Sequence, residues 1–399
     1  MHDWFNGWVN AIQRCSNKVG LALLQVQISR AIPFNPNVDC PYTQNHPHIL
    51  QVSVNLDSIF DGEQYYSRQT VLRELGTRGQ RRLREGKVAI IGLGGLGSVS
   101  ALYLALAGVG ELTLIDQDTV EINNLHRQVL YSLADLRYPK VEAAERRIKQ
   151  INPEVQVNSV AENLRSENVT SILDGTDCVV DGLDNMQTRY IINKYCAEKR
   201  LPFVFGGAIG MEGNVATLKV PETPCLECIL PGLDDLNLPT CDTRGVLGAT
   251  TGIVGAIQAM EAIKVVAEIE PQSRGKLIVF DFAQSEIRTI TLRIRPDCEI
   301  CQVKEKQRPP YPTKLAWLCG SNTANVNPEK PLSLNLQGFA KSVGREHRLL
   351  LSTPTVVVFD FKGHEVSLFQ RGRMLIKNVQ DEQEALEIAR AVIDMTTAA

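Results

Sequence analysis

The sequence contains a glycine-rich turn that could hold a phosphate. Gly92, Gly94 and Gly97 follow the G-x-G-x-x-G spacing in IIGLGGLGS, between an apolar run and a helix-like segment. Such glycines let the backbone approach a phosphate, and a helix N-terminus offers free N–H groups and partial positive charge. Asp116 ends the next apolar run, where a carboxylate can bind a ribose hydroxyl. This acid disfavours a turn used only for packing and predicts a site for NAD, FAD or ATP.

Two cations beyond the acidic residue favour ATP. Arg127 lies in NNLHRQ just past Asp116, and Lys140 stands at the expected start of a helix in YPKVEAAERR. A hydride-transfer site needs an apolar slot for nicotinamide, whereas charge develops on triphosphate oxygens as pyrophosphate leaves. A lone arginine or lysine is more simply a solvated surface charge, but the spacing of this set favours a triphosphate.

A second acidic motif, DGLDN, follows the apolar run at residues 178–181. Ligands bind at the carboxyl ends of parallel strands, so Asp184 is placed to hold Mg²⁺ between phosphate oxygens. Its alternative role is the N-cap of the helix expected from Met186 to Lys199. Both roles can occur close together in one loop.

Two C-x-x-C pairs predict a structural zinc site. Cys225 and Cys228 form the first pair, Cys298 and Cys301 the second, and 69 residues separate them. Two such pairs that meet in space supply four thiolates in tetrahedral geometry and leave no ligand position open. Two redox pairs or four unrelated thiols are the alternatives.

Another cysteine, Cys241 in PTCDTRGVLG, has no C-x-x-C partner. A basic neighbour such as Arg244 can lower the pKa of a thiol and make it a nucleophile. An isolated cysteine is more often inert, so the sequence alone leaves both roles open.

Composition and charge narrow the class of protein. The 399 residues are 44% hydrophobic and 22% charged, with a formal net charge of −3, which gives no basic field for nucleic acid. The most apolar region, 246–266, contains Gln258, Glu261 and Lys264 and is predicted to be a buried helix. We expect no membrane span and no secretory leader, so a cytoplasmic location is the default.

The elements that must position these residues alternate along the chain. Strands are expected at 87–92, 112–116, 178–181, 203–205 and 276–281, and helices at 67–83, 94–107, 140–150, 187–199 and 252–267. This alternation predicts an α/β fold with a doubly wound, mostly parallel sheet. We expect an irregular extension at 1–60, the main domain at 61–303, a linker at 304–314 and a small α+β appendage at 315–399.

Taken together, the motifs resemble the E1-like adenylyltransferases, the MoeB/ThiF/HesA proteins related to ubiquitin-activating enzymes. They occur in the order YYSRQTVLRELGTRGQRRL, VAIIGLGGLGS, LTLIDQDTVEINNLHRQ, YPKVEAA, DGLDN, GGAIGMEGNV, the C-x-x-C pairs and CDTRGVLGA, the last lying between the two pairs, over about residues 63–302. The resemblance implies a Rossmann-like fold. It also implies ATP-dependent adenylation of the C-terminal glycine of a ubiquitin-like sulfur carrier ending Gly-Gly, such as MoaD or ThiS. Sulfur would then attack the acyl-adenylate to give a thiocarboxylate, or a thioester in conjugating relatives.

The resemblance also implies roles for individual residues. Arg68 in YSRQ matches an arginine finger that reaches the partner subunit's site, which implies a homodimer. Cys241 matches a loop cysteine that carries a thioester or persulfide in some members, although adenylation does not require it. The residues implied to bind ATP and Mg²⁺ are Gly92, Gly94, Gly95, Gly97, Asp116, Asn124, Arg127, Lys140, Asp184 and Asn185. The implied Zn²⁺ ligands are Cys225, Cys228, Cys298 and Cys301.

Some residues depart from the family pattern. His126 stands where many members have Gln, and Arg244 where small or acidic residues are frequent. The appendage lacks a rhodanese active-site loop, so sulfur would come from an external sulfurtransferase or cysteine desulfurase, and we expect the appendage to help dock a carrier or partner. Three alternatives stay open: conjugation of a ubiquitin-like protein through Cys241, a dinucleotide-dependent oxidoreductase, and an inactive scaffold. Arg68, Lys140 and the zinc pairs argue against the oxidoreductase.

Overall fold

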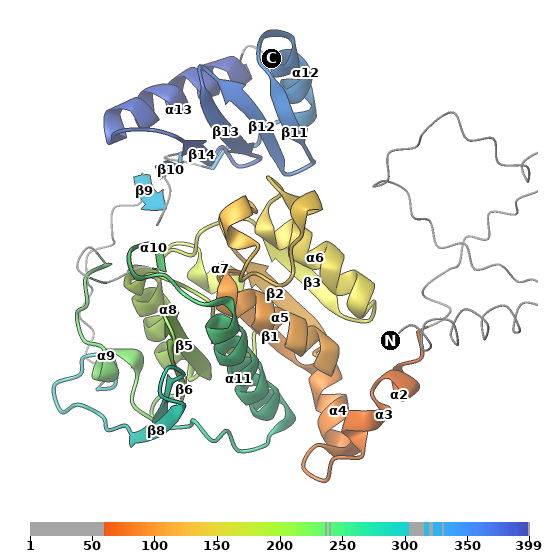
Figure 1. Ribbon diagram of the computed structural model, residues 1–399, viewed down its shortest axis with the longest axis vertical. Coiled ribbons are helices and arrows are strands. Elements are labelled where there is room, and N and C mark those ends of the chain that lie inside the picture. The colour runs from red at the N-terminus through yellow and green to blue at the C-terminus, as the bar shows by residue number, and fades with distance from the viewer. Residues whose placement is uncertain are drawn as a thin grey trace, which may run out of the picture. The chain divides into compact units, whose positions relative to one another are not determined.

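The computed structural model describes residues 60–235, 238, 241–302, 315–318, 322–328 and 331–397. The expected extension at 1–60, apart from residue 60, and the linker at 304–314 therefore lie outside the described residues. Helices and strands carry the labels of Figure 1.

The larger sheet has eight strands in the order β3-β2-β1-β4-β5-β6-β7-β8. The first five strands pair in parallel and the last three pair antiparallel. This confirms the α/β class with a mostly parallel sheet. The strands are β1 (Lys87–Ile91), β2 (Glu111–Ile115), β3 (Gln156–Val160), β4 (Cys178–Asp181), β5 (Phe203–Ile209), β6 (Glu212–Leu218), β7 (Lys276–Asp281) and β8 (Glu286–Thr291).

The central strands β1 and β4 of this sheet are buried on both faces. On β1, Val88 and Ile90 belong to one apolar cluster, while Ala89 and Ile91 belong to a second cluster on the opposite face. A strand covered on both sides reads as a continuous apolar run, which explains VAII. The main covering helices are α4 (Gly76–Glu85), α5 (Gly95–Ala107), α6 (Lys140–Ile151), α8 (Met186–Lys199) and α11 (Gly248–Ala267).

α11 packs along α5, beside which it lies in Figure 1. It is the one helix of the described ranges that is long and apolar enough to cross a membrane, but half of its apolar window is buried. Gln258 is fully buried and donates to the carbonyl of Asp181, and Glu261 accepts from Ser273 and Lys264. These contacts confirm the prediction of a buried core helix.

The prediction of one continuous helix over residues 67–83 is wrong. The sequence pattern suggested a single helix over 67–83, but the chain forms α3 (Ser67–Thr70) and α4, following α2 (Gly62–Tyr65). The two are separated by a turn at 71–75, and Gly76 has a φ of +60°, which a continuous α-helix does not accommodate. The remaining short helices are α7 (Val169–Leu173), α9 (Leu226–Ile229) and α10 (Cys241–Arg244).

Residues 315–397 form a second, antiparallel sheet in the order β11-β12-β13-β14-β10-β9. This sheet and its two helices form the small α+β appendage that the sequence predicted. One face carries an apolar core under α12 and α13. The elements are β9 (Leu315–Leu318), β10 (Thr323–Val326), α12 (Leu336–Glu346), β11 (Leu349–Ser352), β12 (Val356–Phe361), β13 (His364–Phe369), β14 (Met374–Lys377) and α13 (Glu382–Thr397).

Candidate nucleotide site and four-cysteine cluster

A cavity of about 480 Å³ lies at the carboxyl ends of β1, β2 and β4. That position is where ligands bind in open α/β sheets, and the volume falls in the ordinary range for small-molecule sites. Nine of the residues predicted to bind nucleotide line it: Gly92, Gly94, Gly95, Asp116, Asn124, Arg127, Lys140, Asp184 and Asn185. The structure therefore brings these residues to one place.

The glycines of the turn have different duties. A Cβ on Gly97 would lie 1.8 Å from the carbonyl oxygen of Gly92, and a Cβ on Gly92 would lie 2.6 Å from that of Gly182. These two positions need glycine so that α5 and the next loop can pack closely. A Cβ on Gly94 would meet no protein atom nearer than 3.9 Å. Gly94 leaves open space on the cavity side, which suits the approach of a phosphate.

Asp116 is fixed in the cavity wall by backbone donors. Its Oδ2 accepts from the N–H of Leu93 at 2.6 Å, and its Oδ1 accepts from the N–H of Asp118 at 2.7 Å. Burial raises the pKa of Asp116, although the nearby Lys140 opposes that effect. The first contact ties the carboxylate at the end of β2 directly to the glycine turn after β1.

Lys140 is a buried cation held by two carboxylates. Its Nζ lies 2.9 Å from Oδ2 of Asp118, and its side chain is 7% exposed. Burial lowers the pKa of Lys140, but the negative charges of Asp116 and Asp118 outweigh burial and raise it overall. Lys140 therefore stays protonated at neutral pH. The other carboxylate oxygen of Asp118, Oδ1, is buried without a hydrogen-bond partner among the described residues.

The loop after β2 presents Asn124 and Arg127. Asn124 is buried in a short 3-10 turn, where its Oδ1 accepts from the N–H of Glu121 at 3.3 Å. The guanidinium of Arg127 donates to the carbonyl of Asn123 at 2.8 Å and lies 2.9 Å from Nε2 of His126. His126 thus contacts Arg127 directly.

The structure separates the two roles that the sequence left open for Asp184. Asn185 is the N-cap of α8, since its side chain accepts from the N–H of Thr188 at 2.9 Å. Asp235 accepts from the N–H groups of Met186 and Gln187 at 2.6 and 3.1 Å. Asp184 is exposed in the cavity, and none of these three N–H groups needs its carboxylate as an acceptor. Its carboxylate suits an oxygen-preferring cation such as Mg²⁺.

A buried ion pair supports this loop, and sequence reasoning missed it. Asp181 is fully buried and pairs with Nε of Arg189 at 2.8 Å. The same guanidinium donates to the carbonyls of Leu183 and Gly206 at 2.6 and 2.9 Å. Arg189 thereby connects the loop before α8 to β5. The DGLDN motif gave a signal for the acid, but nothing local marked its partner eight positions later.

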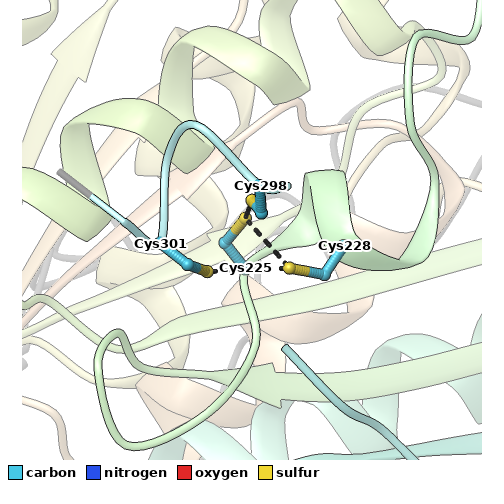
Figure 2. A group of neighbouring side chains, drawn as sticks. All are labelled: Cys225, Cys228, Cys298 and Cys301. Atoms are coloured by element: carbon cyan, nitrogen blue, oxygen red, sulfur yellow. Dashed lines mark hydrogen bonds between the residues drawn. The ribbon is translucent and has the colours of Figure 1, made fainter. Parts of the chain in front are cut away.

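The two C-x-x-C pairs converge, as Figure 2 shows. The four Sγ atoms all lie within 4.8 Å of one another, with Cys225 and Cys298 at 3.5 Å and Cys228 and Cys301 at 3.6 Å. Tetrahedral zinc–thiolate bonds of about 2.3 Å place sulfurs roughly 3.8 Å apart. The donor set therefore fits Zn²⁺. It joins the segment around α9 to the segment after β8.

A family model for the ThiF family matches residues 66–301, well over half of the chain. The chain belongs to the ThiF family. The match ends at Cys301, so it includes all four clustered cysteines and the nine predicted residues that line the cavity, but not Thr323, Leu375 and Lys377, which line it as well. Residues 315–397 lie outside it.

Several curated relatives resemble this ThiF-family chain over the same region. The adenylyltransferase and sulfurtransferase MOCS3 of Anopheles gambiae is 40% identical over 238 residues, which cover 59% of this chain and 54% of that protein. The chain thus spans about half the length of its MOCS3 relatives. The SAMP-activating enzyme E1 of Haloferax volcanii is 40% identical over 237 residues, covering 59% of this chain and 87% of that protein.

Solved structures of E. coli MccB have a similar fold. The structure of MccB with ATP has 26% sequence identity to this chain and a TM-score of 0.54. The match covers 60% of this chain and 74% of that chain. The structure of MccB with MccA-N7isoASN has 26% sequence identity and a TM-score of 0.54, and the match covers 60% of this chain and 76% of that chain. Neither the family nor these relatives supports the oxidoreductase alternative.

One predicted catalytic residue, Arg68, lies apart from the cavity of this ThiF-family chain. Arg68 is exposed on α3 and does not line it. Cys241 begins α10, and its side chain lies outside the described residues. The neighbouring Arg244 pairs with Glu212 at 2.8 Å. The guanidinium that could lower the pKa of the Cys241 thiol therefore already has a carboxylate partner.

Proposed function

We propose that this chain uses ATP to adenylate the C-terminal glycine of a ubiquitin-like sulfur carrier. The observation that carries the proposal is the cavity itself, which places Asp116, Lys140 and Asp184 around the glycine turn of a ThiF-family chain. The names of the 40%-identical relatives, an adenylyltransferase and sulfurtransferase and an E1 activating enzyme, support the same reaction.

The side chains suit the charge changes of that reaction. The carrier carboxylate attacks the α-phosphorus of ATP, a P–O–P bond breaks, and pyrophosphate leaves with the added negative charge. Lys140 and Arg127 line the cavity where that charge develops. Asp184, with Asn185 beside it, would hold Mg²⁺, which supplies further charge neutralisation when bound. Catalysis of this kind depends mainly on positioning and electrostatics.

The proposal includes the partners that this chemistry needs. The carrier ends in Gly-Gly, and an external sulfurtransferase or cysteine desulfurase provides sulfur. Arg68 acts from a second copy of the chain. It is exposed on α3 and does not line the cavity of its own chain, so it can contact the site of a neighbouring copy. A homodimer with two ATP sites and a cytoplasmic location remain part of the proposal.

ATP–pyrophosphate exchange tests this function. Purified protein is mixed with labelled pyrophosphate, ATP, Mg²⁺ and candidate small proteins that end in Gly-Gly, one at a time. We expect exchange that depends on one carrier. Folded, zinc-loaded protein that binds ATP but shows no exchange with any carrier would contradict the proposal and direct attention to another carboxylate substrate.

Activation for conjugation through Cys241 is the second candidate, favoured by the E1 name of the Haloferax relative. The variant Cys241→Ala separates the two. We expect it to retain exchange, because adenylation does not require the thiol. A carrier–enzyme thioester that forms in the original protein, disappears in the variant and passes to an E2-like partner would instead favour conjugation.

A further inference from the structure

The face of the second sheet that points away from its own helices carries polar side chains beside a small apolar cluster of Val356, Val358, Phe369 and Leu375. In the antiparallel register, Thr323 lies opposite Lys377 and Asn325 opposite Leu375, so these four side chains share one face. Their neighbours Ala324 and Ile376 point into the apolar core under α12 and α13. A face with this many buried polar residues needs polar partners.

Those partners come from the ends of β2 and β3. Nδ2 of Asn325 donates to Oε1 of Gln117 at 2.8 Å, and Nη2 of Arg373 donates to the carbonyl of Ala161 at 3.1 Å. Three ion pairs add to these contacts: Lys377 with Glu121 at 2.7 Å, Arg137 with Glu365 at 3.0 Å, and Arg371 with Glu162 at 2.9 Å. The second sheet thus abuts the residues that follow Asp116 and Val160.

This edge is the nucleoside end of the candidate site. The glycine turn follows β1, and Asp184 follows β4, so phosphates belong on that side. The ribose acid Asp116 follows β2, and β3 is the next strand outward. A nucleotide with its phosphates at the glycine turn therefore directs its ribose and base toward the second sheet.

One hydroxyl of the second sheet lacks a partner there. Thr323 is 2% exposed and lines the cavity with Leu375 and Lys377. Its Oγ1 has no hydrogen-bond partner among the described residues. Buried hydroxyls without partners are uncommon and unfavourable, and those that occur often await a ligand or water. The ammonium group of Lys377 is paired with both Glu121 and Glu365, so the alkyl part of its side chain forms part of the cavity wall.

We propose that the second sheet completes the ATP site, with the Thr323 hydroxyl hydrogen-bonded to the nucleoside part of ATP and Leu375 and Lys377 covering it. This inference rests on the proposed use of ATP and names a specificity residue outside the ThiF match. It also gives residues 315–397 a role at the reaction site that does not depend on carrier docking.

Calorimetric titration of the full chain with ATP and with AMP, without any carrier, tests this. Thr323→Val keeps the shape of the side chain and removes the hydroxyl. We expect both nucleotides to bind about three- to tenfold more weakly, since one hydrogen bond is lost. Thr355→Val, in the turn between β11 and β12 and outside the cavity lining, is the matched control and should bind both as the original protein does.

Thermal unfolding of the nucleotide-free variants supplies a second measurement. Because the Thr323 hydroxyl has no partner, Thr323→Val should unfold at the same temperature or higher. Lower stability with unchanged affinity would make Thr323 structural and overturn the inference. Weaker binding of ATP but not of AMP would place the contact at the outer phosphates and also overturn it.

A second pair of variants tests the wall itself. Lys377→Met removes the ion pairs with Glu121 and Glu365 and should weaken the binding of AMP and of ATP by equal factors. Lys362→Met, on the exposed β12–β13 turn, should leave the binding of both nucleotides unchanged. If the original protein exchanges pyrophosphate and all these variants bind nucleotide normally, the inference fails while the proposed function stands. If the original protein binds no adenine nucleotide, both fail.

Discussion

At the scale of single residues, Asp184 is the position whose role the structure sharpens most. The sequence left it between helix cap and metal ligand. Asn185 and Asp235 satisfy the first turn of α8, so the carboxylate of Asp184 is available in the cavity. The stability of α8 should therefore not depend on Asp184. Charge neutralisation at the phosphates should depend on it.

We accordingly expect Asp184→Ala to lower ATP–pyrophosphate exchange at least about 100-fold, the effect of losing one main electrostatic group at a reaction centre. Its unfolding temperature should stay within error of the original protein. Asp174→Ala, an exposed acid at the end of α7 outside the cavity lining, is the control. Normal exchange by Asp184→Ala at millimolar Mg²⁺ would refute its assignment.

How far residue roles could be predicted depends on local spacing. The glycine turn, Asp116, Lys140 and the cysteine pairs were found because each lies in a short motif tied to a strand end. Arg189, Asp235 and Thr323 were missed because only tertiary folding brings them to the cavity and the loop before α8. Asp235 reaches α8 from the segment after α9, and Thr323 reaches the cavity from another sheet.

At the scale of elements, the sequence predicted strands that are buried on both faces. β1 and β4 are apolar runs, whereas β3 has no fully buried residue and has the sequence QVNSV, which is hard to distinguish from a polar loop. β8 is exposed throughout and was also missed. β6 was missed as well although most of its residues are buried, so pairing with β5 and β7 specifies this strand more than its local apolar pattern does.

The junction of β4, α8 and β5 should depend on one ion pair. Arg189→Met leaves the carboxylate of Asp181 buried without its cation, while keeping an unbranched side chain. We expect the free energy of unfolding to fall by about 3–5 kcal/mol, the usual cost of breaking a buried pair. Lys194→Met on the same helix removes only the surface pair with Glu198 and should cost less than about 0.5 kcal/mol. Equal effects in denaturant titrations would contradict this difference.

The four-cysteine cluster ties together segments that no sheet pairing joins. Elemental analysis should find one zinc per chain, and Cys298→Ser should lose it and unfold at a lower temperature, because the metal links α9 to the chain after β8. Cys241→Ser should keep its zinc. Full zinc content in Cys298→Ser would show that the four thiolates do not form the site.

At the scale of the whole described molecule, charge holds residues 315–397 to the sheet that carries the nucleotide cavity. Glu365 links Arg137, after β2, with Lys377 on β14. Burial raises the pKa of Glu365, but Lys377 and Arg137 outweigh burial and hold the pKa below its ordinary value of 4.5. The stabilisation is therefore present above about pH 4.5 and is lost as pH falls through the lower folded-state pKa.

Glu365→Gln should consequently destabilise the protein by about 1 kcal/mol at pH 7, a modest value because these ion pairs are partly exposed to solvent. The difference from the original protein should shrink as the pH is lowered below 4.5. Denaturant titrations across this range, with the exposed Glu346→Gln as control, measure it. Since the same contacts hold β10 and β14 at the cavity, AMP should also bind Glu365→Gln more weakly at pH 7. A stability loss that persists unchanged at acidic pH would mean that Glu365 acts through packing and that the two sheets do not depend on its charge.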